Sequence, residues 1–317
     1  GDEACEKVPI RQGVSLSRGG AYDLLLLTPE PVWMRGAQAS FSPSVFRRCH
    51  AALAPNGIVA LHLDARALPP GRFASIAKAF AAEFAGVQVW CTGAYDWLLV
   101  GSATEIKTPM DGMLGMLEKP PVFRDLARAG LQSLPEVLAC LVCDGKGLSA
   151  WLKTVTPESG WQTMWQAPQT PFAKEKTTLQ PSALEKNRQW KSEWVLPGEL
   201  DVDVYLAVLD KVGKSFGARV SAVKALDETA KGHSDTGLEA ARAAAKINPR
   251  DALLIQFSET LELEGRRRIK IGDFKGALKC YENLLSFAVA TARSHYGMGY
   301  CLRANGDNEI AYLHFAR

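Results

Sequence analysis

The sequence lacks an apolar run long enough to cross a membrane. Its longest apolar stretches, Leu24–Leu27 and Gly57–Leu63, fall far short of the roughly 20 residues that a spanning helix requires. No basic start followed by an apolar core marks a signal peptide. Because the chain begins at Gly1 rather than Met, we expect it to be an excerpt of a longer protein. We therefore expect a soluble, cytoplasmic chain with no membrane segment.

The sequence also lacks an excess of charge of either sign. Its 37 Lys and Arg residues and 34 Asp and Glu residues leave a net charge of +3 over 317 residues. This charge is too small to attract nucleic acid or an anionic membrane surface, so no nucleic-acid partner is expected. We interpret the run Arg266–Arg268 as a solvated helix face. With 47% hydrophobic residues, the chain has enough apolar material for two or three folded cores.

Cysteine and histidine are too sparse for a disulfide framework or a metal centre. The seven cysteines are an odd number in a long chain, which favours a reducing compartment. Cys140 and Cys143 form a CxxC pair inside an apolar stretch with helical spacing, so we predict buried helix cysteines rather than zinc ligands. No metal site is predicted from the histidines, which show no paired ligand spacing: His50, His62, His233, His295 and His314.

A glycine-rich phosphate loop is missing as well. Gly13, Gly19 and Gly20 do not form a GxGxxG pattern and do not follow a predicted strand, so we interpret Arg18–Gly20 as a turn. No nucleophile elbow and no grouping of Ser, His and Asp is present. The sequence therefore contains no complete cofactor or nucleophile motif.

The first third alternates predicted strands and helices. We predict buried strands at 21–27 and 57–63, helices at 43–53 and 70–84, and an antiparallel hairpin of strands near 87–91 and 95–101. This alternation is typical of an α/β sheet, and specifically of its second half.

We divide the chain into four segments. They are the sheet domain at 1–104, its helical extension and returning strand at 105–170, a polar linker at 171–198, and a helical array at 199–317. Within the extension, residues 122–154 are predicted to be helical. Four tryptophans are interpreted as packing residues, with an aromatic ligand cage as the alternative: Trp161, Trp165, Trp190 and Trp194.

The last third contains an internal repeat with a period of 34 residues. The matched pairs are Gly265 and Gly299, Gly272 and Gly306, Asp273 and Asp307, Ala277 and Ala311, and Tyr281 and Phe315. This pattern resembles the tetratricopeptide repeat over residues 218–317. It places small residues where helices cross, Gly-Asp at the turn and an aromatic residue on the second helix. In a weaker earlier copy, Gly232 precedes Gly272 by 40 residues, so one helix should be about six residues longer than usual. Because the sequence stops inside the second helix of the last repeat, we expect the array to be truncated at the C-terminus.

In such arrays the inner faces of the first helices line a groove. The inward positions are Glu259, Glu262, Arg266 and Ile269 in one repeat, and Arg293, Tyr296, Tyr300 and Arg303 in the next. Arginines interleaved with tyrosines suit an extended acidic or aromatic peptide, through paired hydrogen bonds and stacking. The alternative is a solvated helix face.

A second resemblance covers residues 20–168. The residues that carry it are Tyr22, Asp23, Pro29, Trp33–Gly36, Ser40–Ser42, Phe46, Leu53, Pro55, Gly57, Leu68–Pro70, Phe73, Asp96–Ser102 and Thr156–Pro168. Together they are similar to spermidine synthase-like proteins, and most similar to large bacterial members in which such a domain is fused to membrane helices or to repeats. The resemblance therefore also implies a bacterial parent protein tethered to a membrane.

The resemblance implies a methyltransferase-type Rossmann fold that binds decarboxylated S-adenosylmethionine and transfers its aminopropyl group to putrescine. Such a transfer needs an acid just beyond the strand at 21–27 to deprotonate the amine. Thr28 occupies that position and is no base at neutral pH, so Glu30 is the candidate catalytic residue. Thr28, Pro29 and His62 are the candidate cofactor contacts, and Leu61 stands where the family has a glutamine.

Two functions from different classes follow. The first is a non-catalytic scaffold, in which the sheet domain is structural and the repeats bind a protein or peptide. The second is an active aminopropyltransferase or another S-adenosylmethionine-type nucleoside-binding enzyme. This function would require sequence preceding Gly1, because the glycine-rich turn of such a fold belongs to its first half. The hydroxyl of Thr28 favours the scaffold.

Overall fold

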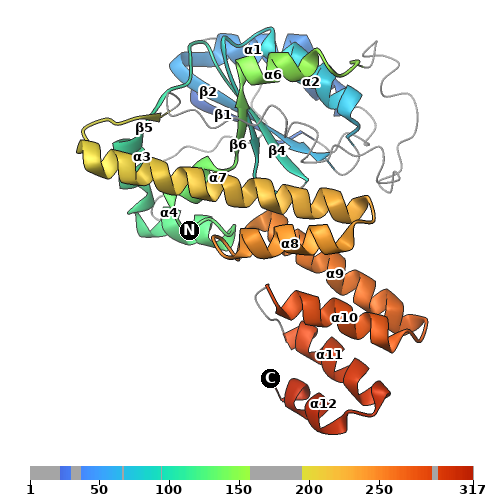
Figure 1. The fold of residues 1–317 in the computed structure, drawn as a ribbon. Helices are drawn as coiled ribbons and strands as arrows, with labels where there is room; N and C mark the ends of the chain where they lie inside the picture. Colours follow the sequence, from blue (N-terminus) through green and yellow to red (C-terminus); the bar gives the residue numbers. More distant parts are fainter. Residues whose placement is uncertain are drawn as a thin grey trace. The chain divides into compact units, whose positions relative to one another are not determined.

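The computed structural model describes residues 22–29, 37–65, 68–93, 95–157, 195–287 and 292–316. The chain divides into two compact units, one of Gly1–Arg128 with Gln132–Gly213 and one of Ala129–Leu131 with Lys214–Arg317. The first unit holds a sheet with helices, and the described part of the second is helical (Figure 1). The predicted order of an α/β region followed by a helical array is therefore confirmed.

A five-stranded mixed sheet forms the centre of the first unit. Its spatial order is β1 (Tyr22–Leu27), β2 (Leu53–Asp64), β4 (Asp96–Ser102), β3 (Gly86–Cys91) and β6 (Leu141–Asp144). β1 is parallel to β2, whereas β4 is antiparallel to both β2 and β3, and β6 is antiparallel to β3. The predicted antiparallel hairpin is thus confirmed as β3 and β4.

One face of the sheet is covered by α1 (Pro43–Ala52), α2 (Pro70–Ala81) and α6 (Gly145–Leu152), as Figure 1 shows. A short 3-10 helix, η1 (Ala37–Phe41), precedes α1. Proline opens α1 and α2, where its missing N–H is not needed. The buried core on this face includes Leu61 of β2, Phe73 of α2 and Trp97 of β4, and the rings of Phe73 and Trp97 are 5.5 Å apart.

The opposite face of the sheet is covered by helices at β3. Trp90 of β3 packs with buried residues of α3 (Met110–Leu117), α5 (Leu134–Leu138) and the first part of α7 (Val202–Ala230), among them Met110, Leu134 and Val212. Two short strands, β5 (Thr108–Pro109) and β7 (Val195–Leu196), pair in parallel and lie directly before α3 and α7 in the chain.

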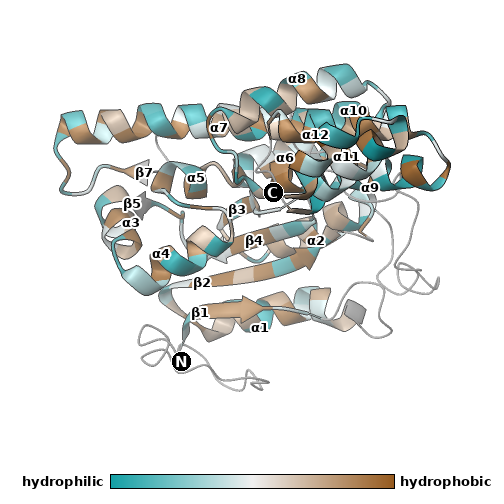
Figure 2. Cartoon of the chain, turned by 90° about the horizontal axis from the view of Figure 1, so that it is seen from below, coloured by the Kyte–Doolittle hydropathy of each residue, from teal (hydrophilic) through white to brown (hydrophobic). Residues whose placement is uncertain are grey.

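The predicted burial of β1 is wrong for one side of the strand. Leu25 and Leu27 pack against the core, but Leu24 and Leu26 are 60% and 62% exposed. β1 forms the edge of the described sheet and pairs only with β2. Leu25 and Leu27 point to the face that the described helices cover, whereas Leu24 and Leu26 point to the other face. Figure 2 shows the leucine part of this strand, Leu24–Leu27, in the hydrophobic colour.

The helix predicted over residues 122–154 is interrupted by a strand. α4 (Pro120–Arg128) and α5 are followed by β6 and then α6, so Cys143 lies in a strand and Cys140 in the turn before it. The apolar run Leu138–Cys143 is compatible with a buried helix or a buried strand by pattern alone. Pairing with β3 decides in favour of the strand.

The second unit consists of successive helices joined by tight turns. They are the last part of α7, α8 (Ser234–Ala245), α9 (Ala252–Lys270), α10 (Phe274–Leu285), α11 (Ala292–Asn305) and α12 (Asn308–Phe315). The turn residues Gly232, Gly272 and Gly306 have φ angles of +89°, +79° and +97°, which glycine adopts without strain. α9 has 19 residues and α11 has 14, so the longer helix expected from the spacing of Gly232 is α9.

Tyr281 of α10 shows why glycines recur in this array. It is 2% exposed and lies between α9 and α11. A Cβ atom on Gly265 of α9 would lie 3.0 Å from Cε2 of Tyr281, and one on Gly297 of α11 would lie 2.3 Å from its Cζ. Both glycines therefore make room for the aromatic ring.

Candidate functional site

The predicted cofactor residues lie at the carboxyl ends of two parallel strands. Leu27 of β1 and Leu61 of β2 are paired in register, so Thr28 and His62 are the next residues on adjacent strands. Thr28 is exposed and Pro29 half-buried. This edge is where α/β sheets generally bind ligands. Glu30, the predicted catalytic residue, lies outside the described residues.

His62 is paired with a carboxylate from the neighbouring strand. Its Nε2 lies 3.2 Å from Oδ1 of Asp96 in β4. This hydrogen bond, together with the charges of Asp96 and Asp64, raises the pKa of His62 above its ordinary value of 6.5, although partial burial opposes the rise. The side chain is 37% exposed. His62 can therefore carry a proton at this edge over a wider pH range than a free imidazole.

The sheet edge contains acids, but they do not occupy the position that the resemblance assigns to the base. Asp64 and Asp96 are paired across β2 and β4, beyond His62, whereas Thr28 follows β1. Leu61 is fully buried in the core, so no polar group replaces the family's glutamine at that position. Asp96 was not singled out from the sequence, because its approach to His62 depends on the register of β4 against β2.

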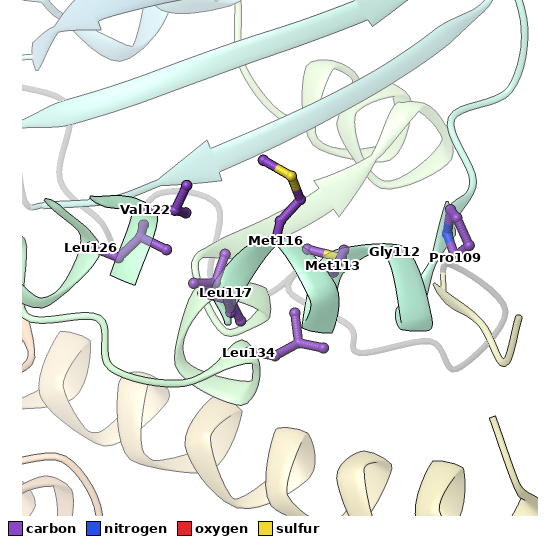
Figure 3. Close-up of a pocket in the computed structure, with 9 residues that line it drawn as sticks. Pro109, Gly112, Met113, Met116, Leu117, Val122, Leu126 and Leu134 are labelled. Carbon is purple, nitrogen blue, oxygen red and sulfur yellow. The ribbon is translucent and has the colours of Figure 1, made fainter. Parts of the chain in front are cut away.

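A second candidate site is an apolar pocket in the helical part of the first unit. It has a volume of about 410 Å³ and is lined by Pro109, Gly112, Met113, Met116, Leu117, Val122, Leu126, Leu134 and Val137. Figure 3 shows that these side chains come from β5, α3, α4 and α5. All nine lining residues are apolar, and methionine adapts its shape to different ligands. The pocket can hold an apolar group but offers no acid, base or nucleophile.

Sequence reasoning did not find this pocket. One available signal was the composition of Met110–Leu117, a short helix that contains three methionines and two glycines. A second signal was the apolar spacing of Val122 and Leu126 in α4, and the structure shows both in the pocket lining although none of the residues of α4 is fully buried. Apolar helix faces usually pack into a core, so neither signal distinguished a pocket from ordinary packing.

The third candidate site is the predicted groove on α9 and α11. Glu262 of α9 pairs with Arg266 on the same helix, and its Oε1 lies 3.9 Å from Nε of Arg293 on α11. The structure thus brings these three predicted residues together. Arg293 nevertheless keeps a side chain that is 74% exposed.

The two groove tyrosines extend this surface along α11. Tyr296 is 63% and Tyr300 is 45% exposed. The ring of Tyr296 lies 5.6 Å from that of Phe315, and the ring of Tyr300 lies 6.2 Å from that of Phe274. These contacts hold the rings in place while leaving much of each accessible. Arg303 is exposed in the last turn of the same helix.

The basic run on α9 is neutralised locally. Arg267 and Arg268 pair with Glu264, and Arg268 also contacts Asp273. Hydrogen bonds from Arg267 and Arg268 lower the pKa of Glu264 to about 2, so this carboxylate stays ionised. Arginines held by carboxylates of their own helix are less available to phosphates, which agrees with a solvated helix face.

The described cysteines are free thiols, and those of the CxxC pair are buried. Burial raises the pKa of Cys301 to about 11, so its thiol stays protonated and unreactive. Within the described part of the chain, no group of three or more His, Cys, Asp and Glu residues is arranged to hold a metal ion. The four tryptophans Trp161, Trp165, Trp190 and Trp194 lie outside the described residues.

No protein-family model, curated protein or solved structure matches this chain. Among the described residues, none of the helices combines the length and the apolar character needed to cross a membrane. The site residues therefore have to be interpreted from their own geometry.

Proposed function

We propose that the chain is a non-catalytic binding scaffold, in which a spermidine synthase-like sheet unit supports a tetratricopeptide-type array that binds an extended acidic or aromatic peptide. The observation that carries this proposal is the surface shared by α9 and α11, where arginines and tyrosines are exposed on adjacent helices. At the sheet edge, by contrast, the position of the expected base carries the hydroxyl of Thr28.

The repeat assignment is supported by features that recur at the same period. Gly272 and Gly306 are both turn residues with positive φ. Asp273 caps α10 by accepting a hydrogen bond from the backbone N–H of Gly276 at 2.9 Å, and Asp307 stands at the matching position before α12. Tyr281 and Phe315 pack against Gly265 and Gly299, which are also 34 residues apart.

The chemistry of the groove favours a peptide that carries negative charge. Glu262 already neutralises part of the charge of Arg266 and Arg293. The guanidinium of Arg303 forms no ion pair or side-chain hydrogen bond with the residues that the structure describes. A peptide carboxylate near Arg293 and Arg303 would gain charge-assisted hydrogen bonds. Aromatic side chains of the same peptide would stack on the exposed rings of Tyr296 and Tyr300.

Charge reversal in the groove tests this proposal. We expect Arg293→Glu combined with Arg303→Glu to weaken binding of a fluorescent peptide of alternating Glu and Phe by about tenfold, because two exposed attractions become repulsions. Fluorescence anisotropy measures the affinity. The matched control is Lys279→Glu on α10, an exposed lysine outside the groove, which should leave the affinity unchanged. Equal binding by all variants would show that the groove face is only solvated.

The second candidate function is an aminopropyltransferase, and the order of the strands favours it. The arrangement β1-β2-β4-β3, with β4 antiparallel between two strands of the same direction, is what the second half of a methyltransferase-type sheet would have. Further strands would then pair with the backbone edge of β1, and the helices that connect them would cover the exposed row of Leu24 and Leu26. Glu30 would have to act as the base, and putrescine or a similar amine would be the acceptor.

Calorimetric titration of the full-length protein with decarboxylated S-adenosylmethionine separates the two functions. The scaffold predicts no heat of binding at millimolar ligand, because Thr28 and a buried Leu61 leave few polar contacts for the nucleoside. Saturable binding of the nucleoside, together with aminopropyl transfer to putrescine that is lost in Glu30→Gln and retained in Glu136→Gln, would establish the enzyme instead.

A further inference from the structure

Two histidines that are far apart in sequence face each other in the last helical hairpin. His295 belongs to α11 and His314 to α12. Their Nδ1 atoms are 3.0 Å apart, and their ring centroids are separated by 5.2 Å with an interplanar angle of 35°. Both side chains are half-buried, so they are held by the helix packing and still reached by water.

The separation of the two nitrogens is suited to a metal ion with right-angled ligands. Imidazole nitrogens bind divalent metals at about 2.0–2.1 Å. At that bond length, nitrogens 3.0 Å apart subtend an angle of about 94° at the metal. A tetrahedral ion would hold the same two atoms about 3.3–3.4 Å apart. The two nitrogens are thus close enough to bind one ion, and imidazole ligands suit copper(II) and nickel(II), which stand at the high end of the affinity order of divalent metals.

We propose that His295 and His314 together bind one copper(II) or nickel(II) ion, which links α11 to α12. In the metal-free pair, the hydrogen on one Nδ1 is donated to the other. Metal binding requires both Nδ1 lone pairs, so this hydrogen moves through solvent to Nε2 of the same ring, and no electron is transferred. Because no third His, Cys, Asp or Glu ligand is grouped with them among the described residues, water completes the coordination.

The site would fasten the end of the helical array. α12 is short, and its exposed side chains include Ile310, Tyr312 and Leu313. A metal ion that binds the folded hairpin but not the separated helices stabilises the packed state by mass action. The ion would therefore slow the opening of α12.

Isothermal titration of the untagged chain with nickel chloride tests the proposal. Nickel is chosen because copper(II) would also oxidise the free thiols of the chain. We expect one ion to bind per chain with a saturable isotherm, and magnesium to give no heat. Single variants His295→Gln and His314→Gln should each lower the nickel affinity about tenfold or more, because a ligand is lost.

The control is His233→Gln, which removes a histidine that pairs with Glu228 on another hairpin and should leave nickel binding intact. Amide hydrogen exchange provides a second readout, since nickel should slow exchange in 308–315 in the wild-type chain and not in the His295→Gln chain. Circular dichroism checks that each variant is folded. The proposal would be overturned if nickel does not bind saturably to the wild-type chain. It would also be overturned if His295→Gln and His314→Gln both keep the wild-type nickel affinity.

Discussion

Thr28 and His62 lie on adjacent strands at one edge of the sheet, and their side chains differ in what they can do with a proton. A threonine hydroxyl neither accepts nor releases a proton near neutral pH, so Thr28 can only donate or accept hydrogen bonds. His62 is held by Asp96, and this pairing raises its pKa. Between Thr28 and His62, only the imidazole of His62, paired with the carboxylate of Asp96, can therefore carry a proton at this edge of the sheet.

The first prediction concerns this pair. Asp96→Asn should lower the pKa of His62 toward 6.5, because the hydrogen bond to the carboxylate is its largest cause. Asp64→Asn should lower it less, since Asp64 contributes only through its charge. Titration of the imidazole resonances by NMR measures both values. An unchanged His62 pKa in Asp96→Asn would contradict the pairing.

The same shift fixes the sign of a stability effect. Because the pKa of His62 is raised in the folded chain, the stabilisation by this pair is fully present below about pH 6.5 and disappears as the pH rises through the folded value. Denaturant midpoints of the wild-type chain and of Asp96→Asn should therefore differ most between about pH 4.5 and 6.5, where an aspartate is ionised and His62 is protonated. The two midpoints should converge at alkaline pH.

At the scale of elements, α9, α10 and α11 are held together by one aromatic ring between two glycines. Tyr281 is buried against Gly265 and Gly297, and burial raises its pKa to about 12. The neutral phenol is therefore kept over the whole physiological pH range. The repeated glycine and aromatic positions of the sequence therefore set how closely neighbouring helices pack.

The second prediction follows from that contact. Gly297→Ala places a Cβ atom 2.3 Å from Cζ of Tyr281, so the helices must move and the free energy of unfolding should fall by about 1–3 kcal/mol. Gly217→Ala is the matched control. Gly217 lies in α7 with no atom within 4 Å of an added Cβ, so this change should raise stability by about 0.5–1 kcal/mol.

Urea unfolding monitored by circular dichroism measures both changes. A further variant, Gly297→Ala with Tyr281→Leu, should be less destabilised than the sum of the two single variants, because the smaller side chain relieves the clash. Additive losses would show that Tyr281 is not the group that meets residue 297.

At the scale of the whole molecule, the chain has separate cores in its two units. The first is built around the sheet, and the second is fastened by a buried ion pair in which Nη1 of Arg219 donates to Oδ2 of Asp251 at 2.7 Å. The two side chains are 1% and 9% exposed. Asp251 also caps α9 by accepting a hydrogen bond from the backbone N–H of Leu253.

The third prediction is that Asp251→Ala destabilises the second unit selectively. Removing one partner of a buried ion pair leaves an uncompensated charge and should cost about 3–5 kcal/mol. Asp273→Ala, which removes a more exposed cap of α10, should cost about 1 kcal/mol. Hydrogen exchange should speed up in α9 and α10 while the amides of β2 and β4 stay protected. Equal losses in the sheet would mean that both units unfold together.

The adjacency of Thr28 and His62 was predictable, because the ends of two parallel strands meet at one edge. The approach of Asp96 was not, since residue 96 follows His62 by a helix and a strand and its register is set by pairing. The residues of the predicted groove on α9 and α11 were obtained by counting along a repeat. The bridging position of Glu262 between Arg266 and Arg293, in contrast, required the packed helices.

The sequence by itself determined the elements whose signals are local: the period of 34, the turn glycines with positive φ, and the alternation of strands and helices in the first third. Tertiary structure alone decided that 141–144 is a strand, that Leu24 and Leu26 are exposed, and that His295 meets His314. Backbone preferences and side-chain periodicity act over a few residues and can be found along the chain. Which distant surfaces meet depends on the packing of whole elements, and no short stretch of sequence encodes it.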